Sequence, residues 1–396
     1  MRTPVTTVRG RQTARRGRPH PQERVAVMQI CDSLDAGGME RVAVNLANAL
    51  PRDRYVSHLC TTRRDGALEG VVAPDVLRLR LERKSTLDVQ EFRRLVQYIR
   101  ESRIALLHAH GPSLFIAAAA SAFAPHPAVI WHDHFGAHET ETRIPWLYRV
   151  PARRLSGVIA VSEALAAWTV EELHVDPVRV KFIKNFVAEP SASLVVPPLP
   201  GAPGKRLVCV ANLRPQKDHR NLLAAMKLVI RAVPKAHLIL LGGSVDAGHT
   251  ERLKAFMDND GLAGHVSWLG SRDDVQAILK GCDVGVLGSA SEGLPLALIE
   301  YGMAGLPAVA TSVGQCAEVL EEGRAGLLVP PGSPQALADA IVSLLRSPDL
   351  RKRLSRRFAT RVREMYSVRK NLDEICELYE SALRSRPRQP DPSKPK

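Results

Sequence analysis

The chain has 396 residues, 45% of them hydrophobic, which is enough for two globular domains with separate cores. Its formal charge of +14 is concentrated at the ends, because residues 1–24 carry seven Arg and one Glu and residues 381–396 carry five basic residues and one Asp. The ends therefore supply +6 and +4 of the charge and leave only +4 for the body, which argues against a specific nucleic-acid-binding protein.

Residues 1–22 are predicted to form a disordered basic tail. They contain no apolar stretch behind the arginines, so they are neither a secretory signal nor a complete twin-arginine signal, and a transit peptide stays open as an alternative. The most hydrophobic stretch, LFIAAAASAFAPHPAVIW, is interrupted by Pro125 and Pro127, which indicates a buried helix followed by a strand and not a membrane span. We expect a cytoplasmic protein, with peripheral contact at the inner face of the membrane as an option.

The six cysteines stand singly in the sequence, at positions 31, 60, 209, 282, 316 and 376. They form no CxxC pair and no cluster with histidine at metal-ligand spacing. We therefore expect reduced thiols, no structural zinc and no cofactor.

Short apolar or β-branched runs alternate with amphipathic segments through the first half of the chain. The runs predict strands at 25–31, 56–62, 104–110, 128–132 and 157–162. The segments between them, such as MERVAVNLANAL and DVQEFRRLVQYIRES, have helical periodicity. This alternation is typical of a parallel sheet covered by helices, so we predict a Rossmann-like α/β domain over residues 23–188.

A Pro-, Gly- and Ser-rich stretch, EPSASLVVPPLPGAPGK, predicts a linker over residues 189–204. The alternation then restarts, with the strand-like runs RLVCVANL, AHLILLGGS, HVSWLGS, DVGVLGS, PAVATS and AGLLVP. We predict a second Rossmann-like domain over 205–366, a helix over 367–384 that completes the first domain, and a disordered tail over 385–396. Two similar α/β domains predict a ligand in the cleft between them, outside the carboxyl ends of the strands.

Three turns that follow predicted strands carry glycine or positive charge. DSLDAGGMER places Gly38 before a helix, where backbone N–H groups can bind an anion, although a tight packing turn explains the glycines equally well. VANLRPQKDH places Arg214 and Lys217 where they could neutralise a diphosphate, unless this loop is merely solvated. LLGGS with Gly243 and WLGSRDD with Arg272 could support a nucleotide base or ribose.

The segment SEGLPLALIE, residues 291–300, places Glu292 just before a helix and Glu300 within its first turns. A helix start explains part of this pattern, since an acid and Pro295 are both favoured near a helix N-terminus. SEGLPLALIEYGMAGLPAVAT also resembles the E-x7-E donor-binding motif of family 4 glycosyltransferases. GGMER, VSEAL, FIKNF, ANLRPQKDH and AGLLVPPGSPQALADAI resemble further segments of that family in the same order, so the resemblance covers about residues 25–380.

The resemblance implies the GT-B fold, an α/β fold in which two Rossmann-like domains with parallel sheets face a central cleft. It implies that Glu300 forms hydrogen bonds with the ribose hydroxyls of the nucleotide. A carboxylate suits this role, because a carboxylate can accept two hydrogen bonds at once. It places Glu292 near the donor sugar, and it turns the backbone N–H groups of Gly293 and Leu294 toward sugar or phosphate at the helix start, where Pro295 has none.

In the same way the resemblance assigns Arg214 and Lys217 to the leaving diphosphate, whose charge grows during transfer. The chain departs from the family at this turn, where an arginine often follows a glycine. Here the corresponding letters are Ala211, Asn212 and Leu213, with the arginine two places later. We expect Arg214 to take the role.

The predicted strand at 128–132 runs into WHDHFGAHE, which contains three histidines, His132, His134 and His138. A metal site and a structural histidine are both alternatives, but no matching Cys or carboxylate pair supports the metal. The resemblance places His132 at the junction of donor and acceptor, with His134 as the reserve candidate.

Together these features predict a retaining glycosyltransferase that uses a nucleotide diphosphate sugar, with UDP or GDP as the nucleotide. The acceptor is expected to be a saccharide or lipid-linked saccharide, in the synthesis of a cell-surface polysaccharide or glycolipid. A nucleotide-sugar epimerase on the same fold and a non-catalytic nucleotide-sugar-binding subunit are the alternatives. The basic tails could add weak, salt-sensitive attraction to an anionic membrane.

Overall fold

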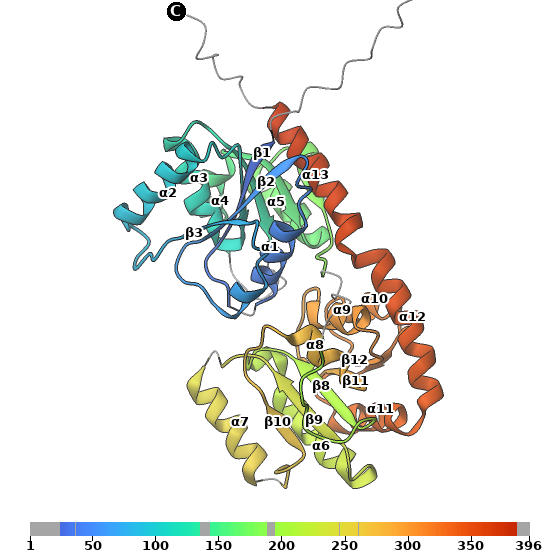
Figure 1. The fold of residues 1–396 in the computed structure, drawn as a ribbon. Helices are drawn as coiled ribbons and strands as arrows, with labels where there is room; N and C mark the ends of the chain where they lie inside the picture. The colour runs from blue at the N-terminus through green and yellow to red at the C-terminus, as the bar shows by residue number, and fades with distance from the viewer. Residues whose placement is uncertain are drawn as a thin grey trace, which may run out of the picture.

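The computed structural model describes residues 24–35, 37–134, 143–187, 195–244, 246–259 and 261–385. These residues form two parallel sheets, one above the other in Figure 1, each covered by helices. The predicted α/β architecture with two Rossmann-like sheets is thereby confirmed. The basic tails at 1–22 and 386–396, and His138, lie outside the described residues.

The first sheet has seven strands in the order β3-β2-β1-β4-β5-β6-β7. Its strands are β1 (Val25–Cys31), β2 (Tyr55–Thr61), β3 (Leu77–Arg80), β4 (Leu106–His110), β5 (Ala128–Asp133), β6 (Leu155–Ala160) and β7 (Val180–Phe182). The helices that alternate with them are α1 (Gly38–Ala49), α2 (Val89–Glu101), α3 (Leu114–Phe123), α4 (Pro145–Ala152) and α5 (Glu163–Leu173), with short 3-10 turns at Ala67–Val71, Gly111–Ser113 and Pro177–Arg179. Sequence patterns found five of these strands and missed the short edge strands β3 and β7.

The second sheet has six strands in the order β10-β9-β8-β11-β12-β13, and all six were predicted. They are β8 (Arg206–Val210), β9 (His237–Leu241), β10 (Val266–Trp268), β11 (Val284–Leu287), β12 (Ala308–Thr311) and β13 (Leu327–Val329). The helices are α6 (His219–Ala232), α7 (Ala247–Asn259), α8 (Val275–Lys280), α9 (Leu296–Met303), α10 (Cys316–Val319), α11 (Pro334–Arg346) and α12 (Pro348–Tyr366), and a 3-10 turn at Pro215–Lys217 precedes α6.

The last helix, α13 (Val368–Arg384), leaves the second half and returns to the first sheet (Figure 1). Its apolar face packs Leu372, Ile375 and Tyr379 against Val27 and Ile130 of β1 and β5, and this contact is part of a buried cluster. A seven-stranded sheet needs cover on both faces, and here a segment distant in the sequence supplies part of it.

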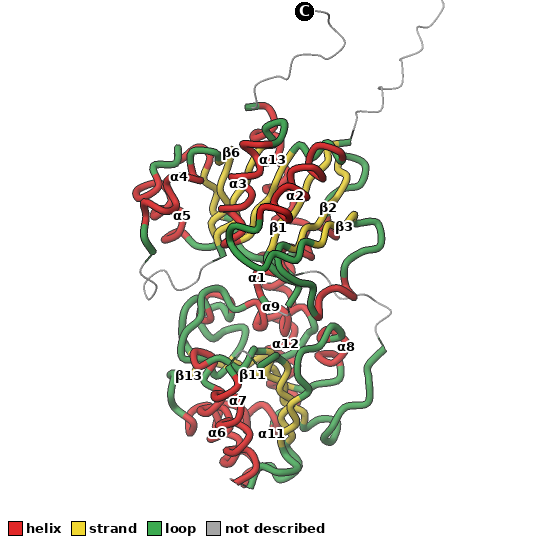
Figure 2. Tube along the Cα trace, turned by 90° about the vertical axis from the view of Figure 1, so that its left-hand side faces the viewer, coloured by secondary structure: helices red, strands yellow, loops and turns green. Residues whose placement is uncertain are grey.

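The two halves meet where α1 and α9 approach each other (Figure 2). A Cβ on Gly38, the first residue of α1, would lie 3.2 Å from the Cδ1 atom of Leu296, the first residue of α9. A side chain at Gly38 would therefore push against the second half. The carboxyl ends of both sheets face this junction, as expected for two domains that share one ligand.

Candidate active site

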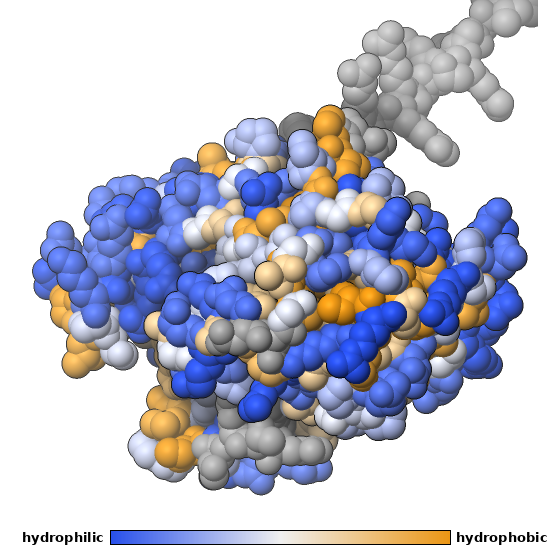
Figure 3. Space-filling view, turned by 90° about the horizontal axis from the view of Figure 1, so that it is seen from below, coloured by the Kyte–Doolittle hydropathy of each residue, from blue (hydrophilic) through white to orange (hydrophobic). Residues whose placement is uncertain are grey.

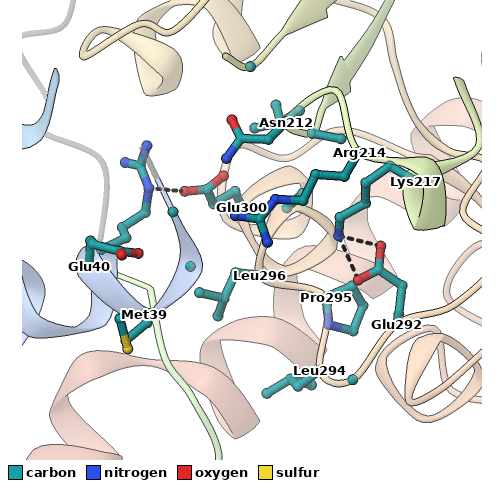
Figure 4. A pocket seen from close by; sticks show the side chains of 18 of the residues that line it. Met39, Glu40, Asn212, Arg214, Lys217, Glu292, Leu294, Pro295, Leu296 and Glu300 are labelled. Carbon is teal, nitrogen blue, oxygen red and sulfur yellow. Dashed lines mark hydrogen bonds and ion pairs between the residues drawn. The ribbon is translucent and has the colours of Figure 1, made fainter. Parts of the chain in front are cut away.

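A cavity of about 770 Å³ lies between the carboxyl ends of the two sheets. Figure 4 shows its lining, which combines residues of the glycine loop and α1 with residues of the second half. All eleven residues proposed from the sequence are described, and nine of them line this cavity: Gly38, Arg214, Lys217, Arg272, Glu292, Gly293, Leu294, Pro295 and Glu300.

The centre of the second half's contribution is an ion pair between Lys217 and Glu292. Lys217 Nζ lies 2.7 Å from both carboxylate oxygens of Glu292, and Ser289 Oγ donates a hydrogen bond of 2.6 Å to Oε1. The side chain of Glu292 is only 6% exposed, so the pair is shielded from water and from salt. Figure 4 shows both side chains directed into the cavity.

Backbone contacts fix the loop that carries Glu292. Gly314, at φ +51°, lies so close that a Cβ would be 2.1 Å from the carbonyl oxygen of Glu292. The N–H of Gln315 donates to the carbonyl of Gly293 at 3.0 Å, and Thr311 Oγ1 donates to the carbonyl of Ser289 at 2.6 Å. The loop is thus held in position by Thr311, the last residue of β12, and by Gly314 and Gln315, which follow that strand.

Lys217 reaches the cavity because of a turn at the start of α6. Asp218 adopts a left-handed conformation, φ 43° and ψ 50°, and its carboxylate caps α6 by accepting a 3.2 Å hydrogen bond from the N–H of Asn221. Asp and Asn tolerate this conformation better than most residues. Arg214, three residues before Lys217, points into the cavity as well (Figure 4).

Glu300 lies on α9 and is 2% exposed. Arg41 of α1 forms an ion pair with it, Nε to Oε1 at 3.1 Å. Burial raises the pKa of Glu300, and the positive charge of Arg41 opposes this shift. Burial also raises the pKa of the neighbouring Glu40, which belongs to the same cavity wall. Glu40 and Arg41 are part of GGMER, but the sequence alone predicted no role for them.

Two other proposed residues have local partners. Arg272 lines the cavity but holds Asp274 in a two-pronged contact at 2.6 and 2.7 Å. Gly243 is set back from the cavity, where its N–H donates to Asn212 Oδ1 at 2.8 Å. Its neighbour Gly242, at φ +152°, lines the cavity instead, and there a Cβ would lie 2.1 Å from the carbonyl oxygen of Ala211.

The structure separates the two histidine candidates. His134 lines the cavity, whereas His132 is 1% exposed and lies behind it, with the two rings stacked at 4.0 Å. The intervening Asp133 points to the other face of the sheet, as alternation along a strand requires, and pairs with Arg143 at 2.7 and 2.9 Å.

Sequence reasoning missed the partners of these histidines. His108 and His110 on β4 lie beside His132 on β5, because the register of the two strands pairs His110 with His132. Ring nitrogens of these three residues come within 4.8 Å of one another, so the described part of the chain contains a histidine cluster that we did not predict. The signal was present as HAH and HDH at the ends of two neighbouring strands.

Six cysteines are described, and all six are buried and free. Burial raises the pKa of the Cys209 thiol to about 12, which makes it a poor nucleophile at neutral pH. Among the described residues, no helix is both long and apolar enough to span a membrane.

Comparison with known proteins identifies both halves. The family model "Glycosyltransferase Family 4" matches residues 36–189, and "Glycosyl transferases group 1" matches residues 200–361. The phosphatidyl-myo-inositol mannosyltransferase of Mycobacterium leprae is 33% identical over 238 residues, which are 59% of this chain and 61% of that protein. The UDP-Gal:alpha-D-GlcNAc-diphosphoundecaprenol alpha-1,3-galactosyltransferase of Escherichia coli is 23% identical over 91% of this chain and 97% of its own length.

Solved structures share the fold. The crystal structure of Anabaena Alr3699/HepE in complex with UDP and glucose superposes with a TM-score of 0.73 at 22% identity, over 90% of this chain and all of that one. Sucrose-phosphate synthase from Thermosynechococcus elongatus gives 0.71 at 19% identity. With two family models on its two halves, this chain belongs to the family 4, group 1 glycosyltransferases.

Proposed function

We propose that the enzyme transfers a sugar from a nucleotide diphosphate sugar to a saccharide or lipid-linked saccharide, with retention of anomeric configuration. The observation that carries this proposal is the cavity, in which the cations Arg214 and Lys217 lie beside the carboxylates Glu292 and Glu300. A nucleotide diphosphate sugar requires both kinds of group, since its diphosphate needs cations and its hydroxyls need hydrogen-bond acceptors.

In the proposed reaction the bond between the anomeric carbon and the diphosphate breaks first, through an oxocarbenium-like state. Lys217 and Arg214 stabilise the negative charge that develops on the departing diphosphate. The acceptor oxygen then bonds to the anomeric carbon on the face that the diphosphate leaves, while a diphosphate oxygen takes the proton of the acceptor hydroxyl, so retention follows without a separate base. Glu300 holds the ribose, and Glu292 orients Lys217 and contacts the donor sugar.

The base of the donor is either uracil or guanine in this proposal. UDP is bound in the Anabaena structure, whereas a relative 30% identical over 152 residues, from Mycobacterium tuberculosis, is named a GDP-mannose-dependent mannosyltransferase. Calorimetric titration with UDP, GDP, ADP and dTDP, without added metal, distinguishes the two. Binding of one nucleotide that Glu300→Ala weakens supports the proposal, and no binding by any of them to folded protein contradicts it.

The same preparation tests transfer against its alternatives. Incubation of the donor sugar with extracted lipid-linked saccharides should give a glycosylated lipid and free nucleoside diphosphate. An epimerised or free sugar formed without acceptor would favour the epimerase, and tight nucleotide binding without any turnover would favour the non-catalytic subunit.

A lipid-linked acceptor would bring the enzyme to a membrane surface. Two relatives are named for lipid substrates, a phosphatidyl-myo-inositol and a diphosphoundecaprenol.

The surface in Figure 3 is mostly hydrophilic with separate apolar patches. On α4, Trp146 is 64% and Val150 66% exposed, next to the exposed Arg153 and Arg154. We propose that α4 makes the peripheral contact with anionic lipid, since aromatic and basic side chains together favour that interface. Sedimentation with anionic vesicles should fall in Trp146→Ser and in Arg153→Ala/Arg154→Ala, but not in Lys235→Ala.

A further inference from the structure

A buried row of polar side chains crosses one face of the first sheet. Gln29 on β1 pairs in register with His108 on β4, and His110 pairs with His132 on β5. Residues two apart on a strand point to the same face, so His108 and His110 share this face, as do His132 and His134. Tyr379 of α13 belongs to the same row, because its hydroxyl forms hydrogen bonds with Gln29 and His108.

The protons of the first branch can be placed by starting from the Gln29 amide, whose nitrogen faces Tyr379. Gln29 Nε2, which can only donate, donates to Tyr379 Oη at 3.1 Å. With the Tyr379 hydroxyl proton directed to His108 Nδ1, His108 carries its own proton on Nε2. That N–H donates to His132 Nδ1 at 3.2 Å. His132 is left with a proton on Nε2, a buried atom that has no partner among the described residues.

The second branch starts at the other end of the same amide. Gln29 Oε1, which can only accept, accepts a 2.9 Å hydrogen bond from His110 Nε2–H. His110 Nδ1 must then accept, and it does so from His134 Nε2–H at 2.9 Å. His134 is left with an unprotonated Nδ1, a buried atom, and the side chain of Asn185 interacts with this ring.

The four imidazoles are neutral, which this assignment requires. Burial lowers the pKa of His108 to about 3 and that of His134 to about 3, and it lowers the pKa of His110 and His132 well below the ordinary value. Each ring therefore carries one N–H near neutral pH, and each must be a donor at one nitrogen and an acceptor at the other.

We propose that Gln29 and Tyr379 are positioning residues that fix His132 as a donor through Nε2–H and His134 as an acceptor through Nδ1. His134 lines the cavity and His132 stacks behind it, so the two rings carry one acceptor and one donor, both on buried atoms next to the cavity. A sugar hydroxyl both accepts and donates a hydrogen bond, so it is the ligand that matches this pair. The inference rests on the proposed function for the identity of the ligand, but the proton order itself does not depend on turnover.

The proton order is tested by NMR of the full chain labelled with [15N]histidine, at pH 7.5. Long-range 1H–15N spectra distinguish protonated from unprotonated ring nitrogens, and single His→Gln replacements assign them. We expect Nε2–H and a bare Nδ1 on all four histidines. A proton on Nδ1 of His132 or His134 would overturn the inference.

Tyr379→Phe removes the hydroxyl that contacts Gln29 and His108 and keeps the shape of the buried ring. In this variant His108 and His132 should each populate both neutral tautomers. His110 and His134 should keep a single tautomer, because their hydrogen bonds depend on Gln29. Tyr55→Phe is the matched control, since the Tyr55 ring packs edge-on against Tyr379 at 6.0 Å but takes no part in the row. Identical histidine spectra in the two variants would refute the proposal. Gln29→Met should allow both neutral tautomers in all four histidines, because it removes the amide from which both branches start.

Activity supplies the second readout. Tyr379→Phe should lower kcat about tenfold with an unchanged KM for the donor nucleotide sugar, and Tyr55→Phe should leave both unchanged. If the chain catalyses no transfer at all, the proposed function fails and the NMR result still decides the proton order. Metal analysis of the purified protein provides a further check. If it found one equivalent of a transition metal that His108→Gln loses, the histidines would form a metal site and the inference would be wrong.

Discussion

Arg41 of α1 and Glu300 of α9 join the two halves of the molecule across the cavity, with Nε and Oε1 3.1 Å apart. The carboxylate that we assign to the ribose is therefore already held by a cation from the opposite half. Nucleotide binding has to displace this ion pair or share the carboxylate with it. Substitutions of Glu300 and of Arg41 should therefore change nucleotide affinity in opposite directions.

Glu300→Ala should weaken binding of the nucleotide by about 10- to 100-fold, because hydrogen bonds to a charged group contribute about 1.5–3 kcal/mol. Arg41→Gln should instead strengthen binding several-fold, since the ribose no longer competes with an ion pair. Calorimetric titration measures both, with the exposed helical Glu374→Ala as the control. Weaker binding in Arg41→Gln would mean that Arg41 contacts the nucleotide itself and does not compete with it.

Lys217→Ala should slow transfer by roughly 100- to 1,000-fold, the usual effect of removing one group that stabilises transition-state charge. Nucleotide affinity should change much less, so the loss should be in kcat. Single-turnover transfer rates measure this effect, and Lys235→Ala on an exposed turn is the matched control.

Lys217 has a second role, because it neutralises the shielded carboxylate of Glu292. The double variant Lys217→Ala/Glu292→Gln separates the roles, since it removes the uncompensated charge along with the lysine. If transfer returned to near its original rate in the double variant, Lys217 would serve only to neutralise Glu292, and its assignment to the diphosphate would be wrong.

Gly314→Ala should displace the loop that carries Glu292, because the new Cβ would lie 2.1 Å from the carbonyl oxygen of Glu292. Gly332→Ala provides a matched control, since Gly332 is also left-handed, at φ +66°, with nothing within 4 Å of its Cβ position. Both variants should lose about 1 kcal/mol of stability to backbone strain, and Gly314→Ala should lose more and also slow transfer. Equal urea midpoints and equal transfer rates in the two variants would contradict this account.

Much of the fold was predictable because its signals are local. Five strands of the first sheet and all six of the second follow from short apolar runs, and the turns that carry Arg214, Lys217 and Glu292 follow from the strands that precede them. The edge strands β3 and β7 were missed, since LRLR and VKF are short and half exposed and give little periodicity.

The parts of the site that were missed are those that depend on distant contacts. Arg41 became visible as a site residue only when α1 and α9 were placed against each other. His108 and Tyr379 meet across 271 positions of sequence, and no local pattern joins them. The choice between His132 and His134 likewise depended on which ring lines the cavity, and that is set by the stacking of neighbouring strands.

The buried histidines should make stability depend steeply on pH. Burial lowers the pKa of His58 to about 4 and that of His108 and His134 to about 3, while an unfolded histidine has a pKa of 6.5. As pH falls below 6.5, these histidines therefore become protonated in the unfolded chain, whereas in the folded chain they stay neutral down to about pH 4. The free energy of unfolding falls over this window, by roughly 1.4 kcal/mol per pH unit for each such histidine.

Two carboxyls, the buried Glu300 and the partly buried Glu40, act in the opposite direction. Burial raises the pKa of Glu40 and Glu300, so the stability that they contribute is present below their ordinary pKa and is lost as pH rises through the raised value. The histidines outnumber them, since His110 and His132 are shifted downward as well. The net effect between pH 6.5 and pH 4.5 is therefore a loss of stability on acidification.

Urea unfolding at pH 7.5, 6.5, 5.5 and 4.5 measures the slope. His58→Gln tests one contribution by itself, because His58 lies on β2 with Tyr98 as its hydrogen-bond partner at 3.0 Å and takes no part in the cavity. This variant should unfold more easily at pH 7.5 but show a shallower pH dependence, by about one histidine's share. A slope that stayed the same in His58→Gln, or a free energy of unfolding that was flat from pH 6.5 to 4.5, would mean that the buried rings accept protons in the folded protein.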